Sequence, residues 1–143
     1  MVRRLVGETM FMQWVAGLPA FLAYFCLSVV AIILYLAIYM AITPHREFDL
    51  IRNDKPGAAL SLGLSMLGFA LPVASAVAHA GDIFECAIWS LIALVVQILV
   101  YYGVRLVMPD VSQRIAAGEM ASAIWLGLAS LTAGLLSAAS MTI

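Results

Sequence analysis

The chain has 143 residues, of which 65% are hydrophobic and 10% are charged, and its mean hydropathy is +1.09. Soluble domains are about 45–50% apolar and about 25% charged, so this composition excludes a soluble fold of this size. The formal net charge of −1 favours neither nucleic-acid binding nor a polybasic tail that binds a membrane surface. The sequence therefore predicts an all-α integral membrane protein whose first partner is the lipid bilayer.

The first predicted span runs from Gly17 to Ile42, with Pro19 in its first turn. This run is longer than the roughly 7–15-residue apolar core of a signal peptide, so we expect it to remain in the membrane. The preceding residues 1–16 are apolar but include Glu8 and Gln13. They are predicted to form a separate segment at the membrane interface.

The stretch 43–55 is the most polar part of the chain and separates the first two spans. Pro44 favours the start of a short helix, in which Phe48 and Ile51 are expected to face the bilayer. Asn53 or Asp54 is the expected N-cap of the second span. The basic side chains of this loop are Arg46, Arg52 and Lys55.

The second span, Pro56 to Ala80, carries small residues spaced alternately by three and four, so they share one helix face. They are Ala58, Ser61, Ser65, Gly68, Pro72 and Ser75. The fourth span, Met120 to Met141, repeats the device with Ala123, Gly127, Ser130, Gly134 and Ser137. In lipid, small residues allow helix backbones to approach closely. Either the two faces pack on each other, or one closes the monomer and the other joins neighbouring subunits in a homo-oligomer.

The third predicted span is Ile83 to Val107, and its strongly polar central residue is Gln97. Asp82 and Glu85 match a capping arrangement at its start. A second polar loop, Pro109 to Glu119, leads to the fourth span.

The order of elements indicates two tandem two-helix repeats, 17–80 and 81–143, because each polar loop begins with a proline and precedes a helix rich in small residues. Each copy would cross the membrane twice, so the repeats are expected to be parallel. The loops between spans one and two and between spans three and four hold most of the basic side chains. This distribution predicts that both loops are cytoplasmic and that both termini are periplasmic.

Five segments carry a resemblance to a known family: ITPHREFDLI, LGFALPVASA, AIWSLIALVVQILV, VRLVMPDVSQRI and GLLSAASMT. From about Leu22 onward the chain resembles a family of bacterial inner-membrane proteins described only as domain of unknown function three hundred and fifty. The resemblance implies four spans, two tandem copies of one unit and an inner-membrane location, and it supplies no activity. Its members share Gly68, Pro72, Ser75 and Gln97, all present here, whereas relatives often carry Asn where this chain has Ser137.

Two residues within the spans have competing interpretations. Pro72 lacks an amide hydrogen and so frees the carbonyl of Gly68, which we expect Ser65 or Ser75 to satisfy. This bend is either a static kink or a hinge whose carbonyl lines a pathway. Gln97 is either a cross-helix hydrogen-bonding residue or a pore contact.

Catalysis and metal binding find little support in the sequence. His79, Asp82 and Glu85 cluster at a turn but fit a solvated cap better than a metal site. Cys26 and Cys86 lie in apolar surroundings without disulfide or metal-site spacing. No nucleophile–base pair, metalloprotease motif, phosphate loop or charged residue deep in a span is present, so we expect no enzyme activity and no cofactor.

The favoured function is a non-catalytic, oligomeric inner-membrane scaffold or accessory subunit, whose charged loop docks a cytosolic or membrane partner through Arg46, Arg52 and Lys55. The alternative is a passive ion or small-solute channel lined by the Ser/Gly faces and Gln97. The helix-packing or pathway candidates are Ser61, Ser65, Gly68, Pro72, Ser75, Gln97, Gly127, Ser130, Gly134 and Ser137.

Overall fold

The computed structural model of the chain describes residues 1–42 and 47–141, and every regular element in these ranges is an α-helix. Four described helices are long and apolar enough to cross a membrane: α1 (Val2–Ile42), α3 (Pro56–His79), α4 (Ile83–Val107) and α6 (Met120–Ser140). Two short helices, α2 (Glu47–Arg52) and α5 (Val111–Ala116), precede α3 and α6. The all-α fold with four spans is confirmed, and the last three spans begin at their predicted residues.

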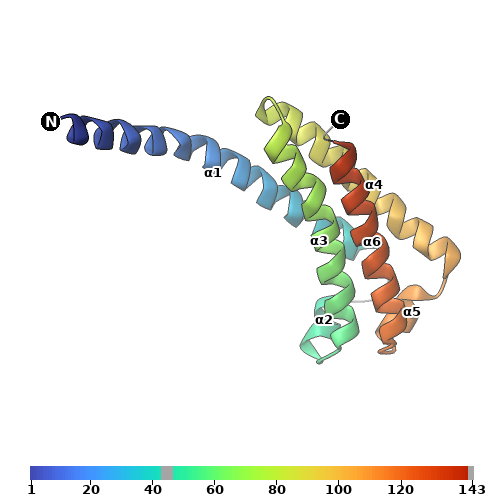
Figure 1. Cartoon of the computed structure of the whole chain (residues 1–143). Helices are drawn as coiled ribbons and strands as arrows, with labels where there is room; N and C mark the ends of the chain where they lie inside the picture. Colours follow the sequence, from blue (N-terminus) through green and yellow to red (C-terminus); the bar gives the residue numbers. More distant parts are fainter. Residues whose placement is uncertain (43–46, 142–143) are drawn as a thin grey trace.

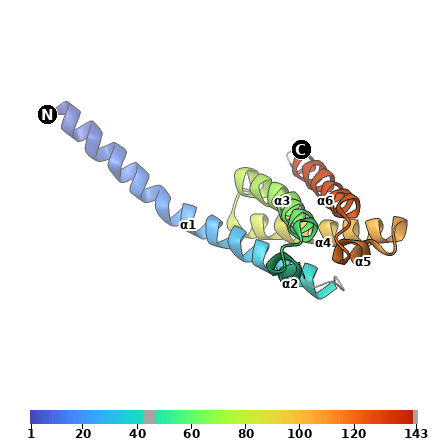
Figure 2. The ribbon, with the colours of Figure 1, turned by 90° about the horizontal axis from the view of Figure 1, so that it is seen from below.

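The helices α3 and α6 form the centre of the molecule and lie side by side along most of their length, with α4 packed across both (Figure 1). Figure 2 shows α4 beneath the α3–α6 pair. The contacts between the two helices run in the same direction along both, from Gly57 beside Ala123 to the hydrogen bond between Ser75 and Ala138. The helices α3 and α6 are therefore parallel.

The helix α1 differs from its predicted form, because it is one uninterrupted helix of 41 residues that includes the expected interfacial segment. Pro19 lies inside this helix and not in its first turn. The break is absent because only one intrahelical hydrogen bond is lost at a proline and the flanking Leu, Ala and Phe residues sustain a helix. Figures 1 and 2 show the N-terminal half of α1 running obliquely away from the bundle.

An aromatic cluster attaches the C-terminal end of α1 to the bundle. Tyr35 stacks on Phe69 of α3, with ring centroids 4.7 Å apart, and Tyr39 meets Tyr101 of α4 edge-on at 5.7 Å. All four rings are at most 2% exposed. Each aromatic pair stabilises the packing by about 0.5–1.5 kcal/mol beyond its buried area, so this cluster fixes the position of the last turns of α1.

The two connecting segments depart from the sequence predictions in three details. Ile51 packs against the core instead of facing the bilayer, because α2 lies against α3. Lys55, not Asn53 or Asp54, is the N-cap residue of α3; it makes no side-chain cap hydrogen bond, because Pro56 begins the helix and lacks the amide hydrogen a cap would satisfy. The segment 109–119, expected to be a polar loop, contains α5, whose residues Val111 and Ile115 are fully buried.

The first residues of two pairs of helices are separated by the same offset along the chain. The helix α5 begins 64 residues after α2, and α6 begins 64 residues after α3. Gly63 and Gly127 have the same offset. The duplication itself stays a prediction.

Candidate functional site

Most of the buried polar side chains of the described chain lie on α3, α4 and α6, around the junction of these helices. The full set is Ser61, Ser65, Ser90, Gln97, Ser112, Ser122 and Ser130, each at most 4% exposed. In a membrane, such side chains are expensive unless they pair with other polar groups. This junction is therefore the part of the molecule whose geometry calls for explanation first.

The centre of the junction is an amide that bridges two helices. Pro72 has no amide hydrogen to donate to the carbonyl of Gly68, and that carbonyl accepts a hydrogen bond from Gln97 Nε2 instead (3.2 Å). Gln97 Nε2 also donates to the carbonyl of Ser130 on α6 (3.2 Å). One side chain of α4 thus holds a carbonyl of each helix in the central pair. The expectation that Ser65 or Ser75 satisfies the Gly68 carbonyl was wrong.

Those two serines have other partners on α6. Ser65 Oγ donates to Ser130 Oγ (3.3 Å), and Ser75 Oγ donates to the carbonyl of Ala138 (3.0 Å). Both bonds join α3 directly to α6. Gln97 of α4 reaches the Gly68 carbonyl because its side chain is longer than that of a serine.

Glycine sets the separation of the pair at the crossing point. A Cβ built on Gly68 would overlap the carbonyl oxygen of Ser130, and one built on Gly134 would overlap the carbonyl group of Gly68. Further along, a Cβ on Gly127 would lie 2.6 Å from Leu64 Cδ1. The two faces of small residues therefore pack on each other, which is the first of the two arrangements that the sequence left open.

Some buried polar atoms of these helices have no hydrogen-bond partner within the described chain: Gln97 Oε1, Ser61 Oγ and Ser122 Oγ. A serine in a helix can rotate its hydroxyl toward the carbonyl one turn back, so the orphaned amide oxygen is the more costly group. The chemistry available at this junction is hydrogen bonding between neutral groups. It contains no described carboxylate, imidazole or ammonium group to transfer a proton.

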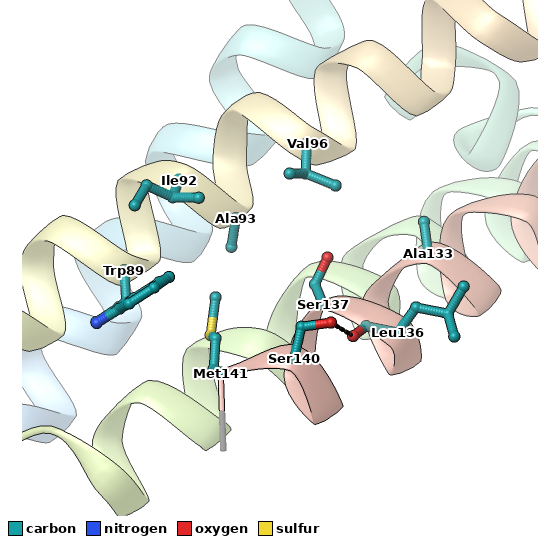
Figure 3. Close-up of a pocket in the computed structure, with 9 residues that line it drawn as sticks. All are labelled: Trp89, Ile92, Ala93, Val96, Ala133, Leu136, Ser137, Ser140 and Met141. Carbon is teal, nitrogen blue, oxygen red and sulfur yellow. Dashed lines mark hydrogen bonds between the residues drawn. The ribbon is translucent and has the colours of Figure 1, made fainter. Parts of the chain in front are cut away.

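A separate crevice opens between α4 and α6 toward the end of the bundle at the α3–α4 turn (Figure 3). Its volume is about 360 Å³, and it is lined by Trp89, Ile92, Ala93, Val96, Ala133, Leu136, Ser137, Ser140 and Met141. Ser140 Oγ donates to the carbonyl of Leu136 (2.7 Å). The hydroxyl of Ser137 points into the space between the two helices. Ser137 therefore lies in the crevice and not in the helix crossing.

The α3–α4 turn forms a cap. Asp82 Oδ1 accepts the amide hydrogen of Glu85 (2.8 Å), and Glu85 Oε2 accepts that of Gly81 (2.7 Å), so the predicted capping arrangement is confirmed. His79 Nδ1 donates to the carbonyl of Ser75 (2.9 Å). Within the described residues, no group of three or more His, Cys, Asp or Glu side chains is placed to hold a metal ion.

The candidate docking residues lie at the opposite end of the bundle. Arg52 and Lys55 are exposed, and Arg46 lies outside the described residues. In the neighbouring segment, Arg114 Nε donates to Asp110 (2.7 Å), and Arg114 Nη1 lies 3.4 Å from Glu119 Oε1. The hydrogen bond from Arg114 holds the pKa of Asp110 below its ordinary value and raises the pKa of Arg114. Arg114 is thus engaged locally, whereas Arg52 and Lys55 present their charges to solvent.

The buried tyrosines contribute to the helix packing in a way that was not predicted from the sequence. Tyr101 is 1% exposed and its hydroxyl lies 3.1 Å from Ser112 Oγ, so it joins α4 to α5. The sequence contained an indication of this role, because a tyrosine hydroxyl within a span requires a polar partner. Tyr35 and Tyr39, one turn apart at the end of the first span, indicate the same kind of packing position.

A family model described as Domain of Unknown Function (DUF350) matches residues 13–141. The chain belongs to the DUF350 family. Two relatives, from Escherichia coli strain K12 and Escherichia coli O157:H7, are each named UPF0719 inner membrane protein YjfL. Each is 42% identical over 126 residues, which cover 88% of this chain and 96% of the relative. No solved structure matches the chain.

The DUF350 match confirms the resemblance drawn from the five sequence segments and extends it toward the N-terminus, from about Leu22 to residue 13. The chain is an integral membrane protein of an uncharacterised family whose relatives are named as inner membrane proteins. The matched region includes the junction, the crevice and most of α1.

Proposed function

We propose that this DUF350 protein is a non-catalytic scaffold or accessory subunit of the bacterial inner membrane, which forms homo-oligomers through α1. The observation that carries the proposal is the exposure of α1. Every residue from Met1 to Ala23 is exposed, although most of them are apolar.

The length of α1 exceeds what a membrane crossing needs. At 1.5 Å per residue its 41 residues extend about 62 Å, whereas the hydrocarbon core of a bilayer is about 30 Å thick. The packed portion, Tyr24 to Ile42, is by itself about 28 Å long. The remaining helix, about 33 Å of it, must be covered by the membrane interface or by protein.

The polar side chains of this free portion favour coverage by protein. A helix that lies on a membrane surface gathers its polar residues on one face. Arg4 and Gln13 are nine residues apart, or about two and a half turns, so they project from opposite faces. An interface with a second copy can accommodate polar residues on several faces, and closed homo-oligomers are the commonest assemblies.

The interior of the bundle supports a static role better than a channel. Ser61 and Ser65 are 0% exposed, and the carbonyl of Gly68 is occupied by Gln97. A channel lined by these groups would require α3 and α6 to separate at the point where their backbones touch. The DUF350 junction is therefore proposed to hold the subunit rigid while other surfaces make contacts.

The charged end of the bundle is the proposed docking surface, defined here by Arg52 and Lys55. Both side chains are exposed, and the basic residues between the spans favour a cytoplasmic location for this end under the positive-inside rule. Both termini would then be periplasmic. A partner with an acidic surface is the expected ligand.

The native cysteines provide a direct test of assembly. Cys26 is exposed on α1 and Cys86 is buried, so mild oxidation of native membranes is expected to yield a disulfide-linked dimer through Cys26. The dimer should disappear in Cys26→Ser and persist in Cys86→Ser.

A cysteine at one position can fail to crosslink because its thiol faces away from the partner, so a series of positions extends the test. In the Cys26→Ser chain, cysteines introduced one at a time at Val6, Met12 and Leu18 lie about 120° from one another around α1, with Leu99 on α4 as a matched exposed control. Crosslinks at one or more α1 positions and none at Leu99 are expected. Monomer at every α1 position would disprove assembly through this helix.

The docking surface has its own experiment. The variant carrying Arg52→Glu and Lys55→Glu is expected to lose a co-purifying partner while its helical content and thermal unfolding remain those of the parent. Arg114→Glu is the matched control, because its charge is already paired with Asp110. Retention of every partner by the double variant would refute docking at this surface.

A further inference from the structure

A second, polar space at the α3–α4 turn adjoins the crevice between α4 and α6. The polar recess has a volume of about 20 Å³ and is lined by Ser75, Ala76, His79, Ala80, Glu85, Trp89 and Met141. Trp89 and Met141 line both spaces, so the crevice and the polar recess are neighbours. Together they form an amphipathic site: a larger apolar part and a small polar end.

The apolar part of the site is short. Its lining residues on α4 extend from Trp89 to Val96, about 10.5 Å at 1.5 Å per residue. A single extended hydrocarbon chain fits along this length.

The residues that face the crevice agree with such an occupant. Ala93 and Ala133 have short side chains, and Trp89 lies at one end of the crevice (Figure 3). The hydroxyl of Ser137 points into the crevice. A hydroxyl at this depth is suited to donate to an ester carbonyl of a lipid.

The polar recess has room for a single small group. A volume of about 20 Å³ admits one water-sized or ammonium-sized group. The described ionisable side chains at this turn are His79, Asp82 and Glu85, so the local charge is negative at neutral pH. This charge attracts a cationic headgroup and repels an anionic one.

We propose that this crevice binds one phospholipid with a primary ammonium headgroup, which places an acyl chain between α4 and α6 and its ammonium group beside Glu85 and Ser75. The chemistry named here is that of phosphatidylethanolamine. The site is independent of the proposed assembly through α1.

Tryptophan fluorescence provides the test, because Trp89 lines both parts of the site. The full-length chain carrying Trp14→Phe and Trp125→Phe keeps Trp89 as its one tryptophan. It is reconstituted in vesicles of equal amounts of phosphatidylethanolamine and phosphatidylglycerol, with brominated acyl chains on one lipid at a time. Brominated phosphatidylethanolamine is expected to quench Trp89 about two- to fivefold more strongly than brominated phosphatidylglycerol, the preference that one partly exposed charge pair gives.

Three variants separate site binding from contact with bulk lipid. Glu85→Gln keeps an oxygen for the Gly81 amide but removes the charge, so the preference should vanish. Ser137→Leu fills the crevice and should lower quenching by brominated phosphatidylethanolamine to the level of phosphatidylglycerol. Thr132→Leu makes the same kind of change at an exposed position of α6 outside the crevice and should leave the preference intact.

Equal quenching by the two lipids in the parent chain would overturn the proposal, because Trp89 would then sense bulk lipid alone. A preference that survives both Glu85→Gln and Ser137→Leu would also overturn it, since neither the charge nor the crevice would be its source. Absence of quenching by either lipid would mean that protein covers the crevice, which the proposal equally excludes.

Discussion

The helices α1 and α3 are both apolar enough to cross a membrane, yet the protein uses them in opposite ways. The most hydropathic window of α1 has a mean hydropathy of 2.6 and is 6% buried, whereas that of α3 has a mean hydropathy of 1.8 and is 50% buried. Hydropathy and burial thus run in opposite directions.

The reason lies in the solvent. In water, the more apolar helix would occupy the core, but lipid tails solvate leucine and valine as well as another helix does. Close packing in a bilayer instead depends on small residues and on hydrogen bonds between helices. The helix α3 has both, in Gly68, Ser65 and Ser75, whereas the buried residues of α1 are Tyr35 and Tyr39, near its C-terminal end.

The largest effect is expected where α3 and α6 touch. Gly134→Ala places a methyl group against the carbonyl group of Gly68, so the helices must separate, at a cost of about 1–3 kcal/mol in the free energy of unfolding. Gly63→Ala on α3 meets nothing within 4 Å and should stabilise by about 0.5–1 kcal/mol. Unfolding of purified protein in detergent by denaturant titration measures both. Equal behaviour of the two variants would contradict the contact.

The next effect concerns the bridging amide. Gln97→Leu removes two hydrogen bonds and leaves the Gly68 carbonyl unsatisfied, which should cost about 1–2 kcal/mol. In a Pro72→Ala background the helix regains an amide hydrogen for that carbonyl, so the same substitution should cost about 0.5–1 kcal/mol less. The double-mutant cycle, read from the same unfolding titrations, tests this coupling. Strict additivity would show that Gln97 does not compensate for Pro72.

A smaller effect is expected at the exposed ion pair of the α4–α6 connection. Arg114 lowers the pKa of Asp110 from its ordinary 3.8, so the pair stabilises the folded state above that pH. The stabilisation is lost as the pH falls through the lowered pKa. The thermal midpoint of Asp110→Asn should therefore lie slightly below that of the parent at pH 7, and the difference should disappear in strong acid. A difference in thermal midpoint that grows on acidification would contradict the stabilising role of this ion pair.

The smallest effect is expected from shortening α1. Deletion of residues 2–16 removes side chains that are all exposed, so the free energy of unfolding should change by no more than about 0.5 kcal/mol. Oxidative crosslinking through Cys26 should fall in the same protein. A large loss of stability would mean that the first turns of α1 support the bundle.

The sequence predicted the fold well because length and small-residue spacing decide it. The four spans, the cap at Asp82 and the common face of Ser65, Gly68 and Ser75 on α3 follow from residue type and period alone. The partner of the Gly68 carbonyl did not follow, because three nearby side chains could reach it and only the packed angle of α4 selects Gln97. Pro19 was misjudged because a proline in an otherwise strong helix weakens it without ending it.

The contact between α3 and α6 has a consequence for how the gene tolerates changes of length. Inserting one residue turns the rest of a helix by about 100° and advances it by 1.5 Å, which removes every downstream glycine and serine from the shared face. Insertion scanning should therefore find a sharply bounded intolerant stretch from Gly57 to Ser75. The first turns of α1 should accept the same insertions, because their side chains are exposed and pack on no neighbouring helix.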